Sequence, residues 1–302
     1  MPTSTIGGDE NDFMNDKQNK MMKQITSILL LTAMLLFSVG CSKKDKQTES
    51  GSQINGFYSG EKTEVASANQ AKPHVKMMEL PAPLTDRPEQ ILRRKGYTAS
   101  YNRETKQPNW VAWHLTKSHT YGKNQRTDEK FTEDNDVSAP RATDWDYYNS
   151  RYDRGHMCPA GDNKWDAEAM RQSFLFTNIC PQNHNLNKYE WNDLEMLCRD
   201  WARQYGAVDI VCGPIYYKDA DRKYIGRNRL PVPDAFFKVV LCRKGNPKAI
   251  GFIYPNDGKK RSMSDCVRTV DEVERITRID FFPALSDDIE NRVEAKANLK
   301  AW

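Results

Sequence analysis

The chain has 302 residues, of which 38% are hydrophobic and 28% charged, and its formal net charge is +4. These fractions are typical of a globular protein with a core, so they exclude a chain that is disordered or fibrous throughout. The mild positive charge is compatible with a polyanionic partner but does not identify one. Length alone does not distinguish one large domain from two small ones.

An apolar segment lies near the start of the chain, at residues 28–37, interrupted only by Thr32. It is shorter than the roughly 20 residues that span a bilayer, but it matches the apolar core of a signal peptide, about 7–15 residues. Lys23 provides positive charge before it, and the small residues 38–40 lead to Cys41. This pattern resembles a bacterial lipobox, in which the cysteine is lipidated and becomes the new N-terminus.

The chain is therefore expected to have four parts. Residues 21–41 are predicted to be a lipoprotein signal peptide, and the polar, acidic residues 1–20 an extension before the true start of translation. Residues 42–78 are mostly polar, cannot bury enough apolar surface to order themselves, and are predicted to be a flexible tether. Residues 79–302 are predicted to form the folded domain. We expect an exported protein of the bacterial cell envelope, held to a membrane by a lipid on Cys41.

Four runs in the folded part are rich in β-branched and aromatic residues and are bounded by turn residues, which predicts strands. They are Trp110–Thr116, Val208–Cys212, Phe236–Cys242 and Ile250–Tyr254. No regular alternation of strands and helices is present, as a parallel sheet would require. The fold class expected is α+β, with a mixed or antiparallel sheet and flanking helices.

Three further segments predict helices. Residues 191–205 place apolar side chains on one face, and Gly206 is a suitable end. Thr269 and Glu272 have the spacing of a capping box, which predicts a short helix over residues 270–277. Residues 287–297 are expected to form a last helix. No glycine-rich phosphate loop and no H-E-x-x-H pair is present.

Six cysteines fall in the folded part, which leaves two interpretations open. In an oxidising compartment they could form three disulfides, with 15 possible connectivities. Alternatively they are small buried hydrophobic residues. The six are Cys158, Cys180, Cys198, Cys212, Cys242 and Cys266.

The segment Tyr152–Pro159 carries the residue types that phosphodiester hydrolysis needs. Arg154 and His156 flank Gly155, and we expect the glycine to let the backbone turn tightly so that both side chains approach one site. Hydrolysis requires a base that deprotonates water and cationic donors that hold a phosphate whose charge grows in the transition state. Histidine and arginine suit these two roles.

A second segment provides oxygen ligands for a hard cation. If a helix begins near Leu186, then Asn187, Trp191 and Glu195 lie at i, i+4 and i+8 along one side of it. An amide oxygen and a carboxylate suit Mg²⁺, which takes few protein ligands and keeps several waters. The alternative is that the asparagines of this segment are helix caps and turn formers.

Together the two segments resemble a known family. "DRGHMCPAGDN" at residues 153–163 and "TNICPQNHNLNKYEWNDLE" at residues 177–195 are similar to the sugar-nonspecific DNA/RNA endonucleases, whose ββα-metal (His-Me finger) core is shared with endonuclease G. The resemblance continues upstream in "YTASYNRETKQPNWVAWHLT" and downstream in "VDEVERITRIDFFPAL". It covers roughly residues 97–285, nearly all of the predicted folded part.

The resemblance implies a role for each matching residue. His156 matches the general base and Arg154 the phosphate-binding arginine. Asn187 matches the single direct protein ligand of Mg²⁺, or alternatively Mn²⁺, and Glu195 the glutamate that holds one of the metal's waters. Arg126 most resembles a second arginine that stabilises the transition state.

Three more positions receive supporting roles by the same comparison. Asn178 matches an asparagine that supports the catalytic site, and Asp153 is expected to orient the loop. Cys158 and Cys180 lie within the two motifs, which raises the possibility of a bridge between them.

The resemblance implies a metal-dependent endonuclease that cuts DNA and RNA with little sequence preference and leaves 5′-phosphate and 3′-hydroxyl ends. Two alternatives belong to other classes. One is a surface lipoprotein that binds nucleic acid without cutting it. The other is a phosphatase or phosphodiesterase that acts on small substrates.

Overall fold

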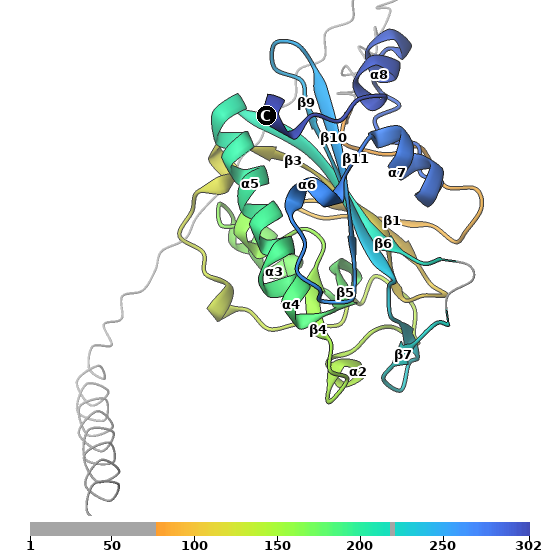
Figure 1. The fold of residues 1–302 in the computed structure, drawn as a ribbon. Coiled ribbons are helices and arrows are strands. Elements are labelled where there is room, and N and C mark those ends of the chain that lie inside the picture. The colour runs from red at the N-terminus through yellow and green to blue at the C-terminus, as the bar shows by residue number, and fades with distance from the viewer. Residues whose placement is uncertain (1–76, 218–220) are drawn as a thin grey trace, which may run out of the picture. The chain divides into compact units, whose positions relative to one another are not determined.

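The computed structural model describes residues 77–217 and 221–302, drawn in colour in Figure 1. The predicted extension, the signal peptide, Cys41 and all but the last two residues of the predicted tether lie outside the described residues. Within the described part of the chain, no helix is both long enough and apolar enough to cross a membrane.

A seven-stranded sheet forms the centre of the domain, with the strand order β1-β2-β3-β6-β9-β10-β11. Every pair of neighbouring strands in it is antiparallel, which resolves the expectation of a mixed or antiparallel sheet. The strands are β1 (Gln90–Arg93), β2 (Thr98–Asn102), β3 (Gln107–Thr116), β6 (Ala207–Ile215), β9 (Ala235–Cys242), β10 (Lys248–Pro255) and β11 (Val267–Arg268). The four predicted strands lie within β3, β6, β9 and β10, each of which is longer than predicted.

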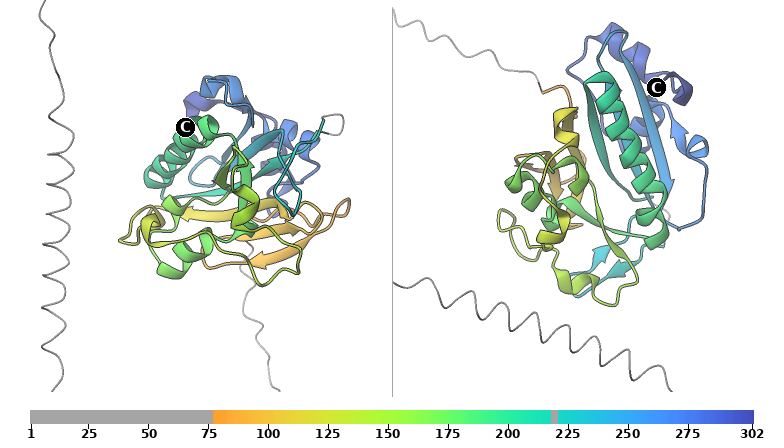
Figure 2. Two further views of the ribbon diagram at one scale, coloured as in Figure 1. Left: turned by 90° about the horizontal axis from the view of Figure 1, so that it is seen from below. Right: turned by 90° about the vertical axis from the view of Figure 1, so that its left-hand side faces the viewer.

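Helices cover both faces of this sheet (Figure 1). The longest, α5 (Glu190–Tyr205), lies lengthwise over the strands on one face (Figure 2), while α7 (Val270–Thr277) and α8 (Asp287–Glu294) lie on the other. Two separate apolar clusters, one on each face, result from this arrangement. All eight residues of β9 are therefore buried, as expected of a central strand covered on both sides.

The helix predictions agree closely with the structure. The apolar side of α5 is buried through Leu194, Cys198 and Trp201, and its C-cap Gly206 has a positive φ of 91°. Helix α7 has the predicted bounds, and the Thr269 capping box is present. Helix α8 ends at Glu294, three residues before its predicted end.

Shorter elements complete the domain. The remaining strands form two-stranded pairs, β4 (Asp153–His156) with β5 (Ile179–Gln182), and β7 (Tyr224–Ile225) with β8 (Leu230–Pro231). The other helices are α2 (Asp144–Tyr147), α3 (Ala167–Ser173), α4 (His184–Lys188) and α6 (Met263–Cys266). Short 3₁₀ helices are η1 (Ser118–Thr120), η2 (Arg126–Asp128), η3 (Ala160–Asp162), η4 (Phe176–Asn178) and η5 (Leu299–Ala301).

One long insertion, residues 117–206, lies between two neighbouring strands of the sheet. Thr116 at the end of β3 is the register partner of Ala207 at the start of β6. The insertion contains the β4–β5 pair followed by α4 and α5, which is the ββα order that the family resemblance implies.

The six described cysteines are all free and buried. The disulfide interpretation is therefore not found in the described part of the chain, and Cys158 and Cys180 are not bridged. The Cys158 sulfur accepts a hydrogen bond from Asn163 Nδ2 at 3.3 Å, and the Cys212 thiol donates to the Met157 carbonyl at 3.2 Å. The cysteines act as small buried residues.

Candidate active site

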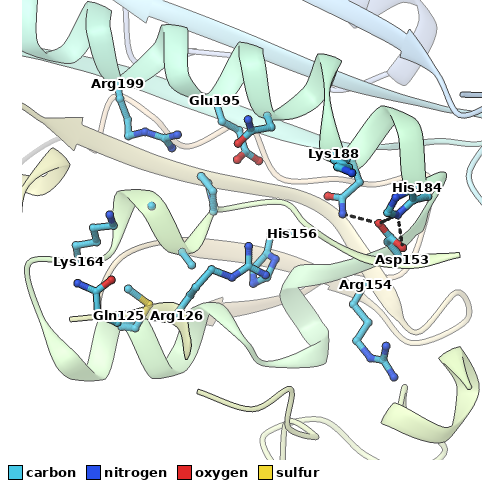
Figure 3. Close-up of a pocket in the computed structure, with 16 residues that line it drawn as sticks. Gln125, Arg126, Asp153, Arg154, His156, Lys164, His184, Lys188, Glu195 and Arg199 are labelled. Carbon is cyan, nitrogen blue, oxygen red and sulfur yellow. Dashed lines mark hydrogen bonds and ion pairs between the residues drawn. The ribbon is translucent and has the colours of Figure 1, made fainter. Parts of the chain in front are cut away.

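A cleft opens on the face of the sheet that α5 covers, and residues 125–199 provide every residue that lines it (Figure 3). Five lining residues are lysine or arginine and two are acidic, so the cleft is basic. The lining residues are Gln125, Arg126, Asp153, Arg154, His156, Pro159, Ala160, Gly161, Lys164, Met170, His184, Asn187, Lys188, Asn192, Glu195 and Arg199.

The β4–β5 pair presents His156 to this cleft. Gly155 lies inside β4 opposite Cys180, so the expectation of a tight turn at this glycine was wrong. The glycine is required by packing instead: a Cβ at this position would lie 2.3 Å from Gln182 Oε1 and 2.5 Å from Gln182 Cβ. Its absence lets β5 approach β4 closely enough to pair.

Aromatic rings hold the His156 imidazole. The ring centre lies 4.9 Å from that of Phe174 and 5.3 Å from that of Phe131. His156 Nε2 is buried and has no hydrogen-bond partner in the described part of the chain. Burial, and then the positive charge of Arg126, lower the pKa of His156 to about 3. The imidazole is therefore neutral near pH 7 and can accept a proton.

The two predicted arginines lie on different sides of this histidine. Arg126 begins η2 and extends toward His156 (Figure 3). Arg154 extends away from His156 (Figure 3), and its Nε donates to Asp144 Oδ1 at 2.6 Å. The Arg154 guanidinium also lies 5.5 Å from the centre of the Tyr147 ring. Both arginines line the cleft. To bind a phosphate beside His156, the Arg154 side chain would have to rotate and give up its hydrogen bond to Asp144.

Asn187 is held at the cleft by Asp153. Its Nδ2 donates to Asp153 Oδ2 at 2.9 Å, which orients the amide so that its oxygen is left for another partner. The same carboxylate lies 3.0 Å from Nδ1 of His184. Asp153 thus orients two side chains of α4, whereas the sequence led us to expect that it orients its own loop.

The expected continuous helix through residues 187–195 is absent. Asn187 belongs to α4. Tyr189, with φ −114° and ψ −86°, is not helical and separates α4 from α5. Trp191 is 1% exposed and packs in the core instead of along the cleft. Asn187 and Glu195 nevertheless both line the cleft, because the break leaves α4 and α5 side by side at this point.

Glu195 enters the cleft from α5 in an unusual environment. Burial raises the pKa of its carboxyl to about 7, although the nearby charges of Lys238 and Arg199 oppose this. Lys238 is 0% exposed, and its Nζ has no hydrogen-bond partner in the described structure but lies 4.3 Å from the Trp191 ring centre. A buried cation of this kind, held by an aromatic ring, gives the core beneath the cleft a positive charge.

Asn178 lies behind the cleft and is fully buried. Its Oδ1 accepts from the Cys158 amide at 2.9 Å, and its Nδ2 donates to the carbonyls of Cys158 and Ser173, both at 2.8 Å. These bonds fix the backbone that follows His156. Asn178 can support the site but does not reach the cleft.

Comparison with known proteins places this arrangement in a family. The family model described as DNA/RNA non-specific endonuclease matches residues 77–288. The chain belongs to this family. The match extends twenty residues before the start of the resemblance seen in the sequence, so β1 and the segment leading to it belong to the endonuclease domain.

Several relatives of the endonuclease family are similar to the chain. Nuclease EXOG, mitochondrial, of Xenopus laevis is 35% identical over 208 residues, which cover 64% of this chain and 58% of that protein. Endonuclease G, mitochondrial, of Homo sapiens is 34% identical over 178 residues, 55% of this chain and 60% of that protein. The chain therefore spans about three fifths of the length of these relatives.

A solved structure of an endonuclease of this family has the same fold. The structure of the EndoG/EndoGI complex superimposes with a TM-score of 0.63 at 27% identity, and covers 66% of this chain and 87% of that chain. This similarity confirms the predicted α+β architecture.

The structure adds endonuclease cleft residues that the sequence did not single out. Lys164, Lys188 and Arg199 add positive charge to the lining, and His184 adds a second imidazole. In the sequence, the one indication that these residues belong to the site is that they lie inside or beside the two motif segments. Lys238 lies 43 residues after Glu195, in a strand whose other residues are apolar, and no motif surrounds it.

Proposed function

We propose that this protein is an endonuclease that hydrolyses phosphodiester bonds of DNA and RNA, depends on Mg²⁺, and leaves 5′-phosphate and 3′-hydroxyl ends. The single observation that carries the proposal is the neutral imidazole of His156, whose Nε2 has no hydrogen-bond partner in the described structure and which lines a basic cleft. Family membership supports the reaction class.

His156 is proposed to accept the proton of the attacking water. His156 lines the cleft, and its neutral imidazole has one unprotonated ring nitrogen that can accept a proton from water. The phosphate anion of a bound substrate favours the charged imidazolium and so raises the pKa of His156 from its low value. The substrate thereby makes the base stronger at the moment when it is needed.

The basic side chains are proposed to bind the polyanion and to neutralise the negative charge that grows at phosphorus. Arg126 extends toward His156 and is best placed for the scissile phosphate. Lys164 and Lys188 line the same cleft and would contact neighbouring phosphates. Because phosphate contacts carry little information about bases, weak sequence preference is expected.

The residues at the cleft fit a magnesium ion. The Asn187 oxygen is oriented by the bond from Nδ2 to Asp153, and the Glu195 carboxylate is destabilised by burial, which a nearby cation would offset. Asn187 would hold Mg²⁺ directly and Glu195 would hold one of its waters, as suits an ion that keeps most of its hydration shell. When bound, the ion supplies Lewis-acid activation of the phosphate and stabilisation of the leaving 3′-oxygen.

The proposal includes the cellular address. A lipid on Cys41 would hold the enzyme at the bacterial envelope, where DNA and RNA outside the cytoplasm are the available polymers. The support is the sequence pattern of residues 28–41.

The deciding experiment combines end-labelling with substitution of His156. Plasmid DNA and a structured RNA should both be cut internally, and the fragments should carry 5′-phosphate and 3′-hydroxyl ends. His156→Ala should lose roughly 10²–10⁴-fold in rate, the usual contribution of a positioned base, while it still binds DNA in a salt-dependent manner.

The matched control is His114→Ala, which removes a histidine outside the cleft. His114 bonds to Asp209, and Arg243 Nε still pairs with that carboxylate at 2.6 Å, so this variant should retain activity. Cyclic or 3′-phosphate ends, activity confined to RNA or to mononucleotide esters, or an active His156→Ala would overturn the proposed mechanism.

A further inference from the structure

Three carboxyl groups meet between α7 and α8, on the face of the sheet opposite the cleft. They belong to Asp271 and Glu274 of α7 and to Glu294 at the end of α8, and one carboxylate oxygen from each lies within 4.8 Å of the other two. Packing of Val273 and Val293 in the same apolar cluster brings the two helices together here. The cluster therefore joins two helices that are separate in the sequence.

The burial of Glu294 is the feature that requires an explanation. The residue is 5% exposed, and its Oε1 is buried without a hydrogen-bond partner in the described structure. Leaving a buried carboxylate oxygen unsatisfied is costly.

These three carboxyl groups have no ion-pair partner in the described part of the chain. None of the ion pairs within residues 77–217 and 221–302 includes Asp271, Glu274 or Glu294. One oxygen of Glu274 accepts from the Phe281 amide at 2.7 Å. Burial and the neighbouring carboxylates raise the pKa of Glu294 to about 9 and that of Glu274 to about 7. A cation bound between these carboxyl groups would stabilise their ionised forms and offset the cost of burying them.

We propose that Asp271, Glu274 and Glu294 bind a calcium ion that links α7 to α8. Ca²⁺ takes 6–8 oxygen ligands in flexible geometry and accepts bidentate carboxylates, so three carboxylates can supply most of its shell. Mg²⁺ gives up its waters reluctantly, and a glutamate as buried as Glu294 leaves little room for them. The chemistry therefore favours calcium over the ion proposed for the cleft.

The proposed calcium site is structural. It lies on the opposite face of the sheet from His156, so it contributes no group to the reaction. Its effect is on stability: an ion that binds the folded state and not the unfolded state stabilises the fold by mass action. Calcium should therefore raise the melting temperature without being able to replace the cation of the cleft.

The test measures the thermal stability and calcium affinity of the full chain near neutral pH. The probe is Ca²⁺ alone, compared with EDTA, by differential scanning calorimetry and isothermal titration. All variants carry Asn187→Ala, so that the proposed cleft ligand is absent and cleft binding cannot be mistaken for this site. At a calcium concentration about 100 times its Kd, the melting temperature should rise by about 5 °C or more.

Two substitutions decide the result. Glu294→Gln should abolish the calcium-dependent rise and the titration signal, yet should match or exceed the parent's stability in EDTA, because it removes an unpaired buried acid. Asp288→Asn, which changes an exposed acid of α8 outside the cluster, should keep the full calcium response. The proposal would be overturned if calcium does not raise the melting temperature of the parent, or if the rise persists in Glu294→Gln. In the first case, the carboxyl groups are stabilised by sharing protons and not by a cation.

Discussion

At the scale of single residues, the hydrogen bond between Asp153 and Asn187 orients the amide of the proposed metal ligand without the help of a metal ion. An amide can present either its oxygen or its nitrogen to a cation, and only the oxygen binds. By accepting from Asn187 Nδ2 at 2.9 Å, Asp153 selects the oxygen. Second-layer contacts of this kind typically change metal affinity by about 10–100-fold when they are lost.

This geometry gives a graded prediction. Asn187→Ala should abolish Mg²⁺-dependent cleavage and leave the melting temperature nearly unchanged, because the side chain is only partly buried. Asp153→Asn should raise the Mg²⁺ concentration needed for half-maximal rate by about 10–100-fold. Glu195→Gln should be milder than Asn187→Ala, since it is proposed to act through water.

The measurement is cleavage rate against Mg²⁺ concentration for each variant, with circular dichroism as the control for folding. Near-wild-type cleavage by Asn187→Ala at limiting Mg²⁺ would remove this residue from the metal site.

Sequence patterns could identify single residues only where a motif surrounds them. Arg154, His156, Asn187 and Glu195 fall in two short segments, and all four line one cleft. Lys238 could not be found in this way, because burial of its cation depends on Trp191, which reaches it from another element. Contacts between distant segments leave no local pattern.

At the scale of elements, the β4–β5 pair depends on the absence of one Cβ. Gly155→Ala should lower the free energy of unfolding by about 1–3 kcal/mol, as overpacking of a close contact commonly does. Activity should also fall, because His156 is the next residue along β4. Removing the opposing Cβ in the double variant Gly155→Ala/Gln182→Gly should restore part of both.

Urea denaturation and plasmid nicking of the single and double variants check this prediction. If Gly155→Ala is as stable and active as the parent, the close approach to Gln182 is not what requires the glycine.

The long apolar elements were predictable and the short polar ones were not. Strands β9 and β10 each have eight residues rich in apolar side chains, so their composition alone indicates a strand. Strands β4 and β5 have four residues each and contain glycine or proline, and only their mutual pairing makes them strands. The break at Tyr189 was missed because the segment before it is too short for a helical period to be tested.

At the scale of the whole molecule, the lipid anchor is the prediction that the described residues leave open. Cys41→Ser should prevent lipidation and release the protein from the membrane fraction, while cleavage of DNA by the soluble protein continues. Cell fractionation followed by immunoblotting measures the distribution. The lipobox interpretation fails if the substituted protein stays with the membranes to the same extent as the parent.

The insertion between β3 and β6 has a consequence for how this protein can change over time. The residues that flank it, Thr116 and Ala207, are paired in the sheet, so the whole segment is inserted between two neighbouring strands. Every residue that lines the cleft belongs to it, and so does α5, which covers one face of the sheet. A mutation in these ninety residues can therefore affect both catalysis and the stability of the fold. Residues outside the insertion do not line the cleft, so a mutation there affects the chemistry only through the fold or through charges beneath the cleft.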